Sequence, residues 1–303
     1  MVDLQTTFAG IELRNPVLLA SGTCGYGDEL TPFIDLARLG GIVTKTITPE
    51  PRAGNPPPRV VETPAGMLNS IGLQNPGLED FLSVKWPFLS RLDTRVIVNI
   101  AAPTARLHGQ MAARLEEAEG IAAIEVNISS PNMKDGGMLF GCSPTASAEV
   151  IASVRASTSR PVIAKLTPNV TDISAIARAV AEAGADGLSM INTLLGMAVD
   201  LPSRRPFLGN VTGGLSGPAI KPVALALVHK VRQSVDLPIM GLGGISNATD
   251  ALEFIVAGAT AVQVGTATFV EPAAADRIVD GIEDYCRQED VDRVESLVGT
   301  LRL

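Results

Sequence analysis

One short segment gathers polar side chains directly after an apolar stretch. The run from Ile121 to Val126 is typical of a buried strand, and Asn127-Ile-Ser-Ser-Pro-Asn132 follows it at once. Polar side chains at the exit of a buried strand cost free energy unless partners satisfy them. In an α/β barrel the strand exits are where ligands bind and react. The hydroxyl of Ser130 is therefore a candidate reactive group.

Polar residues end several other predicted strands as well. These residues are Ser21, Lys45 with Thr46, Asn99, Asn127, Lys165, and Asn192 with Thr193. The carboxyl ends of barrel strands converge on one mouth, so these side chains are expected to share one site. A single residue of this kind would usually be structural, but six consecutive strands with such ends favour a binding site.

Two further strands end in glycine, at Gly241-Leu-Gly-Gly-Ile245 and at Gly265-Thr266. Glycine lets backbone N–H groups approach an anion closely, and the loops after strands seven and eight are the usual phosphate site of such a barrel. Ordinary tight turns use the same residues, so either turn alone is weak evidence. Together they predict a phosphate site, with the loop from Thr212 to Gly217 as a further wall.

A phosphate site with two interior lysines and many amides suits flavin mononucleotide (FMN), because a lysine can stabilise the charge of a reduced flavin ring. Pyridoxal phosphate is a rival, since its chemistry also needs a lysine. The amides of Asn69, Asn127, Asn132 and Asn192 each offer a donor and an acceptor, which favours a pyrimidine-like ligand.

Eight apolar runs alternate with helical patterns and must position these residues. The predicted strands are Val17–Ala20, Gly41–Lys45, Val96–Ile100, Ala123–Asn127, Val162–Lys165, Gly187–Ile191, Pro238–Gly241 and Ala261–Gly265. Such alternation favours one (β/α)8 barrel, or TIM barrel, spanning residues 1–303, over an open doubly wound sheet. A short hairpin at residues 4–13 is expected to plug the barrel's bottom. A long Pro/Gly-rich loop at residues 46–76, after strand two, is expected to form a lid or substrate wall.

Composition narrows the class of protein. The net charge of −8 argues against nucleic acid as the main partner. No apolar stretch approaches the ~20 residues of a membrane span, and the N-terminus does not read as a secretory signal. The cysteines Cys24, Cys142 and Cys286 form no disulfide or metal pattern, which fits a reducing cytoplasm. His108 and His229 stand apart and are expected to be structural, so no metal site is predicted.

The chain resembles the dihydroorotate dehydrogenase family along essentially its whole length. The resemblance is carried by residues 15–22 (Asn-Pro-Val-Leu-Leu-Ala-Ser-Gly), 45–46, 54–59, 67–75, 127–132, 191–193, 212–222 and 241–244. It is strongest to the soluble class 1 enzymes, and within them to the 1B type, which uses NAD through a partner subunit. It implies oxidation of (S)-dihydroorotate to orotate in pyrimidine synthesis, with the C6 hydride passed to FMN.

The resemblance also implies roles for individual residues. FMN would be held by Ser21, Lys45, Thr46, Asn99, Asn127, Lys165, Ile191, Gly217, Gly243, Gly244, Gly265 and Thr266. Dihydroorotate would be held by Lys45, Asn69, Ser70, Ile71, Gly72, Leu73, Asn127, Asn132, Asn192 and Thr193. A homodimer is implied, and a 1B-like enzyme would join an FAD and iron–sulfur subunit in a heterotetramer. Without that subunit, fumarate or a quinone would have to accept the electrons.

Position 130 departs from the class 1 pattern, which has cysteine as the catalytic base. Serine there is typical of the membrane-associated class. A thiol has a pKa near ~8.5 and an alcohol is far less acidic, so Ser130 would need a proton relay or strong local activation. Cys142 lies twelve residues downstream in the sequence and is the alternative base, although the motif position favours Ser130.

Two other functions remain open on the sequence. A related FMN barrel could act on another pyrimidine, such as dihydrouracil or a tRNA uridine, and the acidic balance counts against the tRNA version. A phosphate-binding lyase or isomerase would use no flavin, and an absorbance spectrum separates it from the flavin enzymes.

Overall fold

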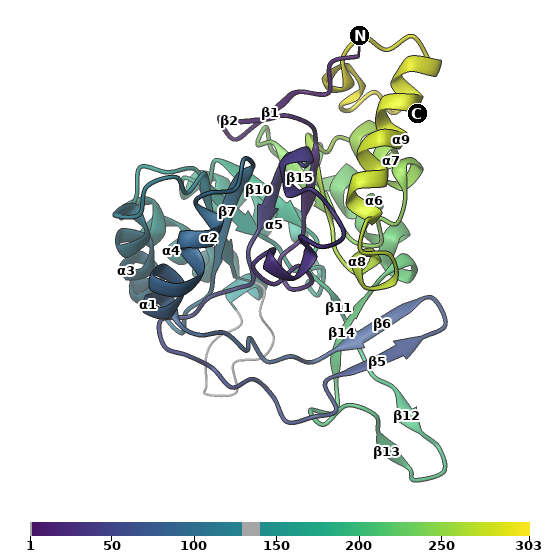
Figure 1. Cartoon of the computed structure of the whole chain (residues 1–303). Helices are drawn as coiled ribbons and strands as arrows, with labels where there is room; N and C mark the ends of the chain where they lie inside the picture. The colour runs from purple at the N-terminus through teal and green to yellow at the C-terminus, as the bar shows by residue number, and fades with distance from the viewer. Residues whose placement is uncertain (1, 129–139) are drawn as a thin grey trace.

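Eight parallel strands close into a barrel at the centre of the computed structural model (Figure 1). The structure describes residues 2–128 and 140–303. The strands are β3 (Val17–Leu19), β4 (Gly41–Val43), β7 (Arg95–Ile100), β8 (Ala123–Asn127), β9 (Val162–Lys165), β10 (Gly187–Met190), β15 (Ile239–Leu242) and β16 (Ala261–Val264). They pair in the order β10-β15-β16-β3-β4-β7-β8-β9, and β9 closes onto β10. The predicted barrel is confirmed, with strand ends within two residues of those expected.

Helices cover the outside of the barrel. The longer ones are α3 (Ala105–Glu116), α4 (Pro144–Arg155), α5 (Ile173–Glu182), α6 (Lys221–Arg232), α7 (Ala248–Val256) and α9 (Ala274–Gln288). The short ones are η1 (Asp28–Leu30), η2 (Leu36–Arg38), α1 (Leu78–Asp80), η3 (Phe81–Lys85), α2 (Trp86–Leu89), η4 (Phe140–Cys142), η5 (Pro218–Ile220), α8 (Ala267–Val270) and η6 (Val294–Leu297). Barrel strands are therefore buried on both faces, which is why their sequences read as continuous apolar runs. Within the described parts of the chain, no helix is long and apolar enough to cross a membrane.

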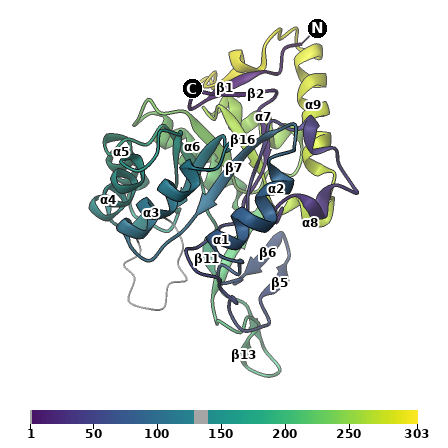
Figure 2. The same cartoon turned by 60° about the vertical axis from the view of Figure 1, so that its left-hand side comes forward.

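The N-terminal hairpin plugs one end of the barrel, as predicted. Strands β1 (Thr6–Phe8) and β2 (Ile11–Leu13) pair antiparallel, and Phe8 is fully buried. Phe8 clusters with inward residues of the barrel strands, among them Leu18, Ile97 and Ile163. The contact is close, since a Cβ built on Gly187 would lie 2.8 Å from the Phe8 ring. This end is thus filled with side chains, and Figures 1 and 2 show the hairpin at the end opposite β5 and β6.

A small antiparallel sheet projects from the other end, as both views show (Figures 1 and 2). Its order is β11 (Leu194–Gly196), β14 (Gly213–Ser216), β6 (Gly66–Asn69) and β5 (Val60–Thr63). A two-stranded extension, β12 (Val199–Asp200) and β13 (Arg205–Pro206), continues from it. The connection at 46–76, predicted as a loop, therefore contains a hairpin that pairs with the segment following barrel strand β10.

Candidate active site

A pocket lies at the carboxyl ends of the barrel strands, beneath the projecting sheet. Predicted site residues that line it are Ser21, Lys45, Thr46, Asn69, Ile71, Gly72, Leu73, Asn127, Lys165, Ile191, Asn192, Thr193, Gly217, Gly243, Gly244, Gly265 and Thr266. Gln263 and Phe269 also line the pocket and were not predicted, whereas Met67 and Ser216 line it from the two segments expected to form its walls. Segments far apart in the sequence are thus brought to one mouth, and β6 provides the wall expected from residues 46–76.

Two predicted residues do not line this pocket. The Ser70 side chain is buried, and its hydroxyl accepts a hydrogen bond from Asn55 Nδ2 at 2.8 Å. The Ser70 side chain therefore links two parts of the 46–76 segment and does not face a ligand. Asn99 is fully buried inside the barrel. Ser130 and Asn132 lie outside the described residues.

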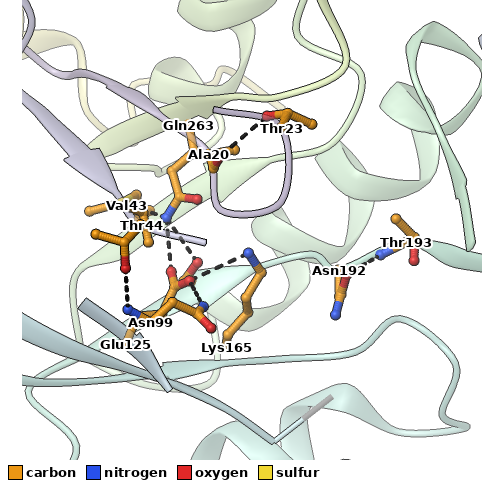
Figure 3. Close-up of polar contacts among 12 residues, drawn as sticks. Ala20, Thr23, Val43, Thr44, Asn99, Glu125, Lys165, Asn192, Thr193 and Gln263 are labelled. Atoms are coloured by element: carbon orange, nitrogen blue, oxygen red, sulfur yellow. Dashed lines mark hydrogen bonds and ion pairs between the residues drawn. The ribbon is translucent and has the colours of Figure 1, made fainter. Parts of the chain in front are cut away.

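A layer of polar side chains is buried in the barrel around Glu125 (Figure 3). Glu125 Oε1 accepts a hydrogen bond from Asn99 Nδ2 at 2.5 Å and lies 3.4 Å from Lys165 Nζ. Its other oxygen, Oε2, accepts from Gln263 Nε2 at 2.9 Å. Gln263 also contacts Ser189 Oγ at 3.2 Å. The carboxylate is thus a shared acceptor for side chains from several strands.

Strand register explains why these side chains meet. Asn99 on β7 is the register partner of Glu125 on β8, and Lys165 on β9 is the partner of both Asn127 and Ser189. Successive side chains of a strand point to opposite faces, so Glu125 and Asn127, two residues apart, share the interior face. The barrel therefore stacks the Glu125 layer directly beneath the strand exits.

The charges in this layer compensate one another. Burial alone would raise the pKa of Glu125. The positive charge of Lys165 and hydrogen bonds from three neutral side chains outweigh that effect, so the pKa lies below its usual value. Glu125 is therefore a carboxylate at neutral pH. Burial lowers the pKa of the Lys45 ammonium, which an anionic ligand would raise again.

The glycine turns form a narrow backbone cradle at one side of the pocket. Gly217, Gly243 and Gly244 have φ of +93°, +125° and +84°, which favours glycine. A Cβ on Gly244 would lie 2.8 Å from the backbone nitrogen of Lys221 and 2.9 Å from Gly217 O. A side chain would fill this cradle, so its shape fits the close approach of a phosphate to the backbone.

The cysteines and histidines within the described ranges carry no evident reactive role. Burial raises the pKa of Cys24 to about 12, which keeps it a thiol. Cys142 is exposed on η4 and does not line the pocket. Burial lowers the pKa of His108 to about 4, and its Nε2 accepts from the Ala102 N–H at 3.0 Å, as a structural histidine would. His229 contacts Gln233 near the surface, and no group of three metal-ligating side chains occurs within residues 2–128 and 140–303.

Sequence reasoning missed the buried acceptor layer. Glu125 and Gln263 each lie in the middle of an apolar strand, whereas the predicted site residues come mainly from the strand ends and the loops that follow them. The available signal was the charge itself. A carboxylate inside a strand buried on both faces must have partners.

Comparisons with known proteins agree with this architecture. The family model described as dihydroorotate dehydrogenase matches residues 3–286. The chain is 58% identical over 302 residues to the dihydroorotate dehydrogenase B (NAD(+)) catalytic subunit of Desulforamulus reducens, covering 100% of this chain and 99% of that protein. It is 56% identical over 301 residues to the protein of the same name from Geotalea daltonii, covering 99% of each.

A solved structure shows the same fold. The crystal structure of DHODH from Eimeria tenella in complex with ferulenol superposes with a TM-score of 0.82 at 24% identity, covering 98% of this chain and 88% of that one. The family match over residues 3–286 and the relatives at 56% and 58% identity show that this chain belongs to the dihydroorotate dehydrogenase family.

Proposed function

We propose that this protein oxidises (S)-dihydroorotate to orotate in pyrimidine biosynthesis, with FMN at the mouth of the barrel. The observation that carries the proposal is a single pocket combining the glycine cradle, Lys45, Lys165 and several amides. The relatives named dihydroorotate dehydrogenase B, 52–58% identical over nearly their whole length, support the same activity.

The pocket suits both parts of FMN. Gly217, Gly243, Gly244 and Gly265 with Thr266 would hold the phosphate, and Lys165 would lie beside the ring. Ser21, Thr46, Asn127 and Ile191 complete the proposed cofactor set, while Asn99 is buried in the barrel and does not line the pocket. Bound flavin supplies the hydride acceptor, while the protein supplies orientation and electrostatics.

Dihydroorotate presents a carboxylate, two ring N–H groups and two ring carbonyls. The Lys45 ammonium matches the carboxylate in charge, and the amides of Asn69, Asn127 and Asn192 can pair with the ring. Thr193 and residues 71–73 complete the proposed substrate set with Asn132, whereas the Ser70 side chain bonds Asn55 and does not line the pocket. Ser130 is proposed to remove the C5 proton, because it holds the motif position and because Cys142, the alternative, is exposed and does not line the pocket.

The direct test is a spectrum followed by anaerobic titration. The purified protein is expected to show flavin absorption bands that bleach on addition of dihydroorotate, with one orotate formed per flavin reduced. Dihydrouracil serves as the control substrate and should leave the bands unchanged. A colourless protein that does not bind added FMN, or bleaching by dihydrouracil alone, would overturn the proposal.

We further propose that electrons leave through a separate subunit carrying FAD and an iron–sulfur cluster, which passes them to NAD. The printed name "catalytic subunit" of the relatives supports a second subunit. A homodimer within a cytoplasmic heterotetramer is part of the same proposal. The projecting sheet and its extension expose Leu195, Met197, Val199, Leu201, Phe207 and Val211, and such an apolar patch is typical of an interface.

A second apolar surface adjoins the proposed flavin pocket and suits the electron-transfer subunit. A groove next to the pocket shares Val60, Met67 and Phe269 with it. Val270 at its edge is 88% exposed and does not line the flavin pocket. A partner seated there would lie close to the flavin.

Val270→Glu is therefore expected to lower dihydroorotate-dependent NAD reduction by the two-subunit complex at least about tenfold, because a charge would be buried at the interface. Direct reduction of a dye by the catalytic subunit should be unchanged. Val84→Glu is the matched control, since Val84 is 66% exposed and lines neither cavity. Equal losses with NAD and dye, or no loss with NAD, would place the partner elsewhere.

A further inference from the structure

Two buried carbonyl oxygens in the Glu125 layer have no hydrogen-bond partner. Asn99 Oδ1 and Gln263 Oε1 accept no hydrogen bond from any residue in ranges 2–128 and 140–303. Both side chains are at most 1% exposed. A buried polar atom without a partner costs roughly 1–3 kcal/mol, so the orientation of these two amides needs a cause.

Glu125 is that cause. A carboxylate only accepts hydrogen bonds, so each amide must turn its NH2 group toward it. Asn99 presents Nδ2 to one carboxylate oxygen and Gln263 presents Nε2 to the other. Turning either amide over would place a carbonyl oxygen against a negatively charged oxygen. The carboxylate therefore holds both carbonyl oxygens away from itself, as Figure 3 shows for Gln263.

Gln263 connects the Glu125 layer to the pocket. Gln263 lines the proposed flavin site, and its Oε1 is the side-chain atom that is left without a hydrogen-bond partner. Lys165 lines the same pocket, is 4% exposed, and has Glu125 as its counter-ion at 3.4 Å. One carboxylate thus governs both an acceptor and a positive charge beside the ligand.

We propose that Glu125 is a positioning residue for the cofactor. Its carboxylate orients Gln263 so that Oε1 accepts the hydrogen bond of ring N3–H, which is the one N–H group of the oxidised flavin ring. It also opposes the charge of Lys165 and so sets how strongly the site favours the anionic reduced ring. This inference rests on the proposed FMN site.

Glu125→Gln keeps the size of the side chain and changes both effects. An amide offers one oxygen where two donors now approach, so Asn99 or Gln263 must face a donor or turn over. Lys165 also loses its counter-ion and favours reduced flavin more strongly. We expect oxidised FMN to bind the apoprotein at least about tenfold more weakly at pH 7. We expect the ratio of dissociation constants, oxidised over reduced, to rise about tenfold, which is about 30 mV in midpoint potential.

The potential separates positioning from a merely structural role, since structural damage would weaken both flavin forms equally. Glu125→Asp keeps the charge and should restore a potential close to that of the unsubstituted protein. Asp186→Asn is the matched control. Asp186 forms a 2.8 Å ion pair with Arg155, and neither residue lines the pocket, so this variant should leave the affinity for FMN and the midpoint potential unchanged. A Glu125→Gln protein with an unchanged potential would overturn the inference.

A second comparison does not depend on how Glu125→Gln folds. N3-methyl-FMN lacks the proposed donor, so it should bind the unsubstituted apoprotein at least about tenfold more weakly than FMN. Gln263→Met lacks the acceptor and should discriminate much less between the two flavins. Equal binding of both flavins by the unsubstituted protein would reject the role of Gln263. Failure to bind either flavin would instead reject the proposed function.

Discussion

Ser130→Ala is expected to slow dihydroorotate-dependent flavin reduction at least about a hundredfold while FMN remains bound. A positioned base contributes roughly 10²- to 10⁴-fold to a proton transfer, and alanine removes the oxygen that would accept the C5 proton. Anaerobic stopped-flow absorbance at the flavin band measures the rate directly. The flavin content of the purified variant shows whether the site is intact.

Cys142→Ala is the matched control for Ser130→Ala, since it removes the competing candidate base. Cys142 is exposed and does not line the pocket, so this variant should reduce flavin at close to the original rate. If Ser130→Ala keeps that rate and Cys142→Ala loses it, the two roles must be exchanged.

Ser130→Cys tests the chemistry of the same position. A thiol with a pKa near ~8.5 ionises much closer to neutral pH than an alcohol does. The variant should therefore stay active with a more neutral pH optimum. An unchanged pH profile would mean that residue 130 does not limit proton removal.

The barrel and most of its mouth could be predicted because both follow from local patterns. Buried parallel strands need continuous apolar runs, as in Val162–Lys165, and their exits converge whatever the intervening helices are. Asn127, Lys165 and Gly243 were therefore placed correctly at one pocket without any knowledge of distances.

The parts that could not be predicted depend on long-range pairing. Residues 60–69 form a hairpin that pairs with β14, and the register Leu68↔Leu215 joins positions far apart in the sequence. The position of Ser70 is likewise decided by its bond to Asn55. Helix α5 shows the limit at short range. The sequence pattern indicates Thr171 as the residue that caps this helix, and that prediction is wrong, because Asp172 caps it by accepting from the Ser174 N–H.

The role of Glu125 was hidden for a related reason. A single charged residue in an apolar run does not indicate a function until its partners are known. Those of Glu125 come from four other strands. Only the closed barrel brings Lys165, Asn99 and Gln263 around it.

Lys165→Met is expected to destabilise the apoprotein by about 3–5 kcal/mol at pH 7, because it leaves the Glu125 carboxylate buried without its counter-ion. Flavin reduction should also fall sharply, since the charge beside the reduced ring is lost. Urea unfolding of the apoprotein measures the free energy of unfolding. Lys85→Met is the control, because the Lys85–Asp28 pair at 3.2 Å lies at the surface and such pairs contribute about 0–1 kcal/mol.

The contribution of Glu125 to the free energy of unfolding should depend on pH with opposite sign in the original protein and in the Lys165→Met variant. In the original protein the Glu125 pKa is lowered on folding, so its contribution is present above the unfolded-state pKa and fades as pH falls through the folded-state pKa. Without Lys165, burial dominates and raises the Glu125 pKa, so the folded state binds the extra proton. The loss of unfolding free energy caused by Lys165→Met should then shrink as pH falls from 7 to 5.

Adding Glu125→Gln to Lys165→Met should recover much of the stability at pH 7 but not the rate of flavin reduction. A cost that is independent of pH and persists in the double variant would show that Lys165 stabilises the barrel by packing and not as the counter-ion of Glu125.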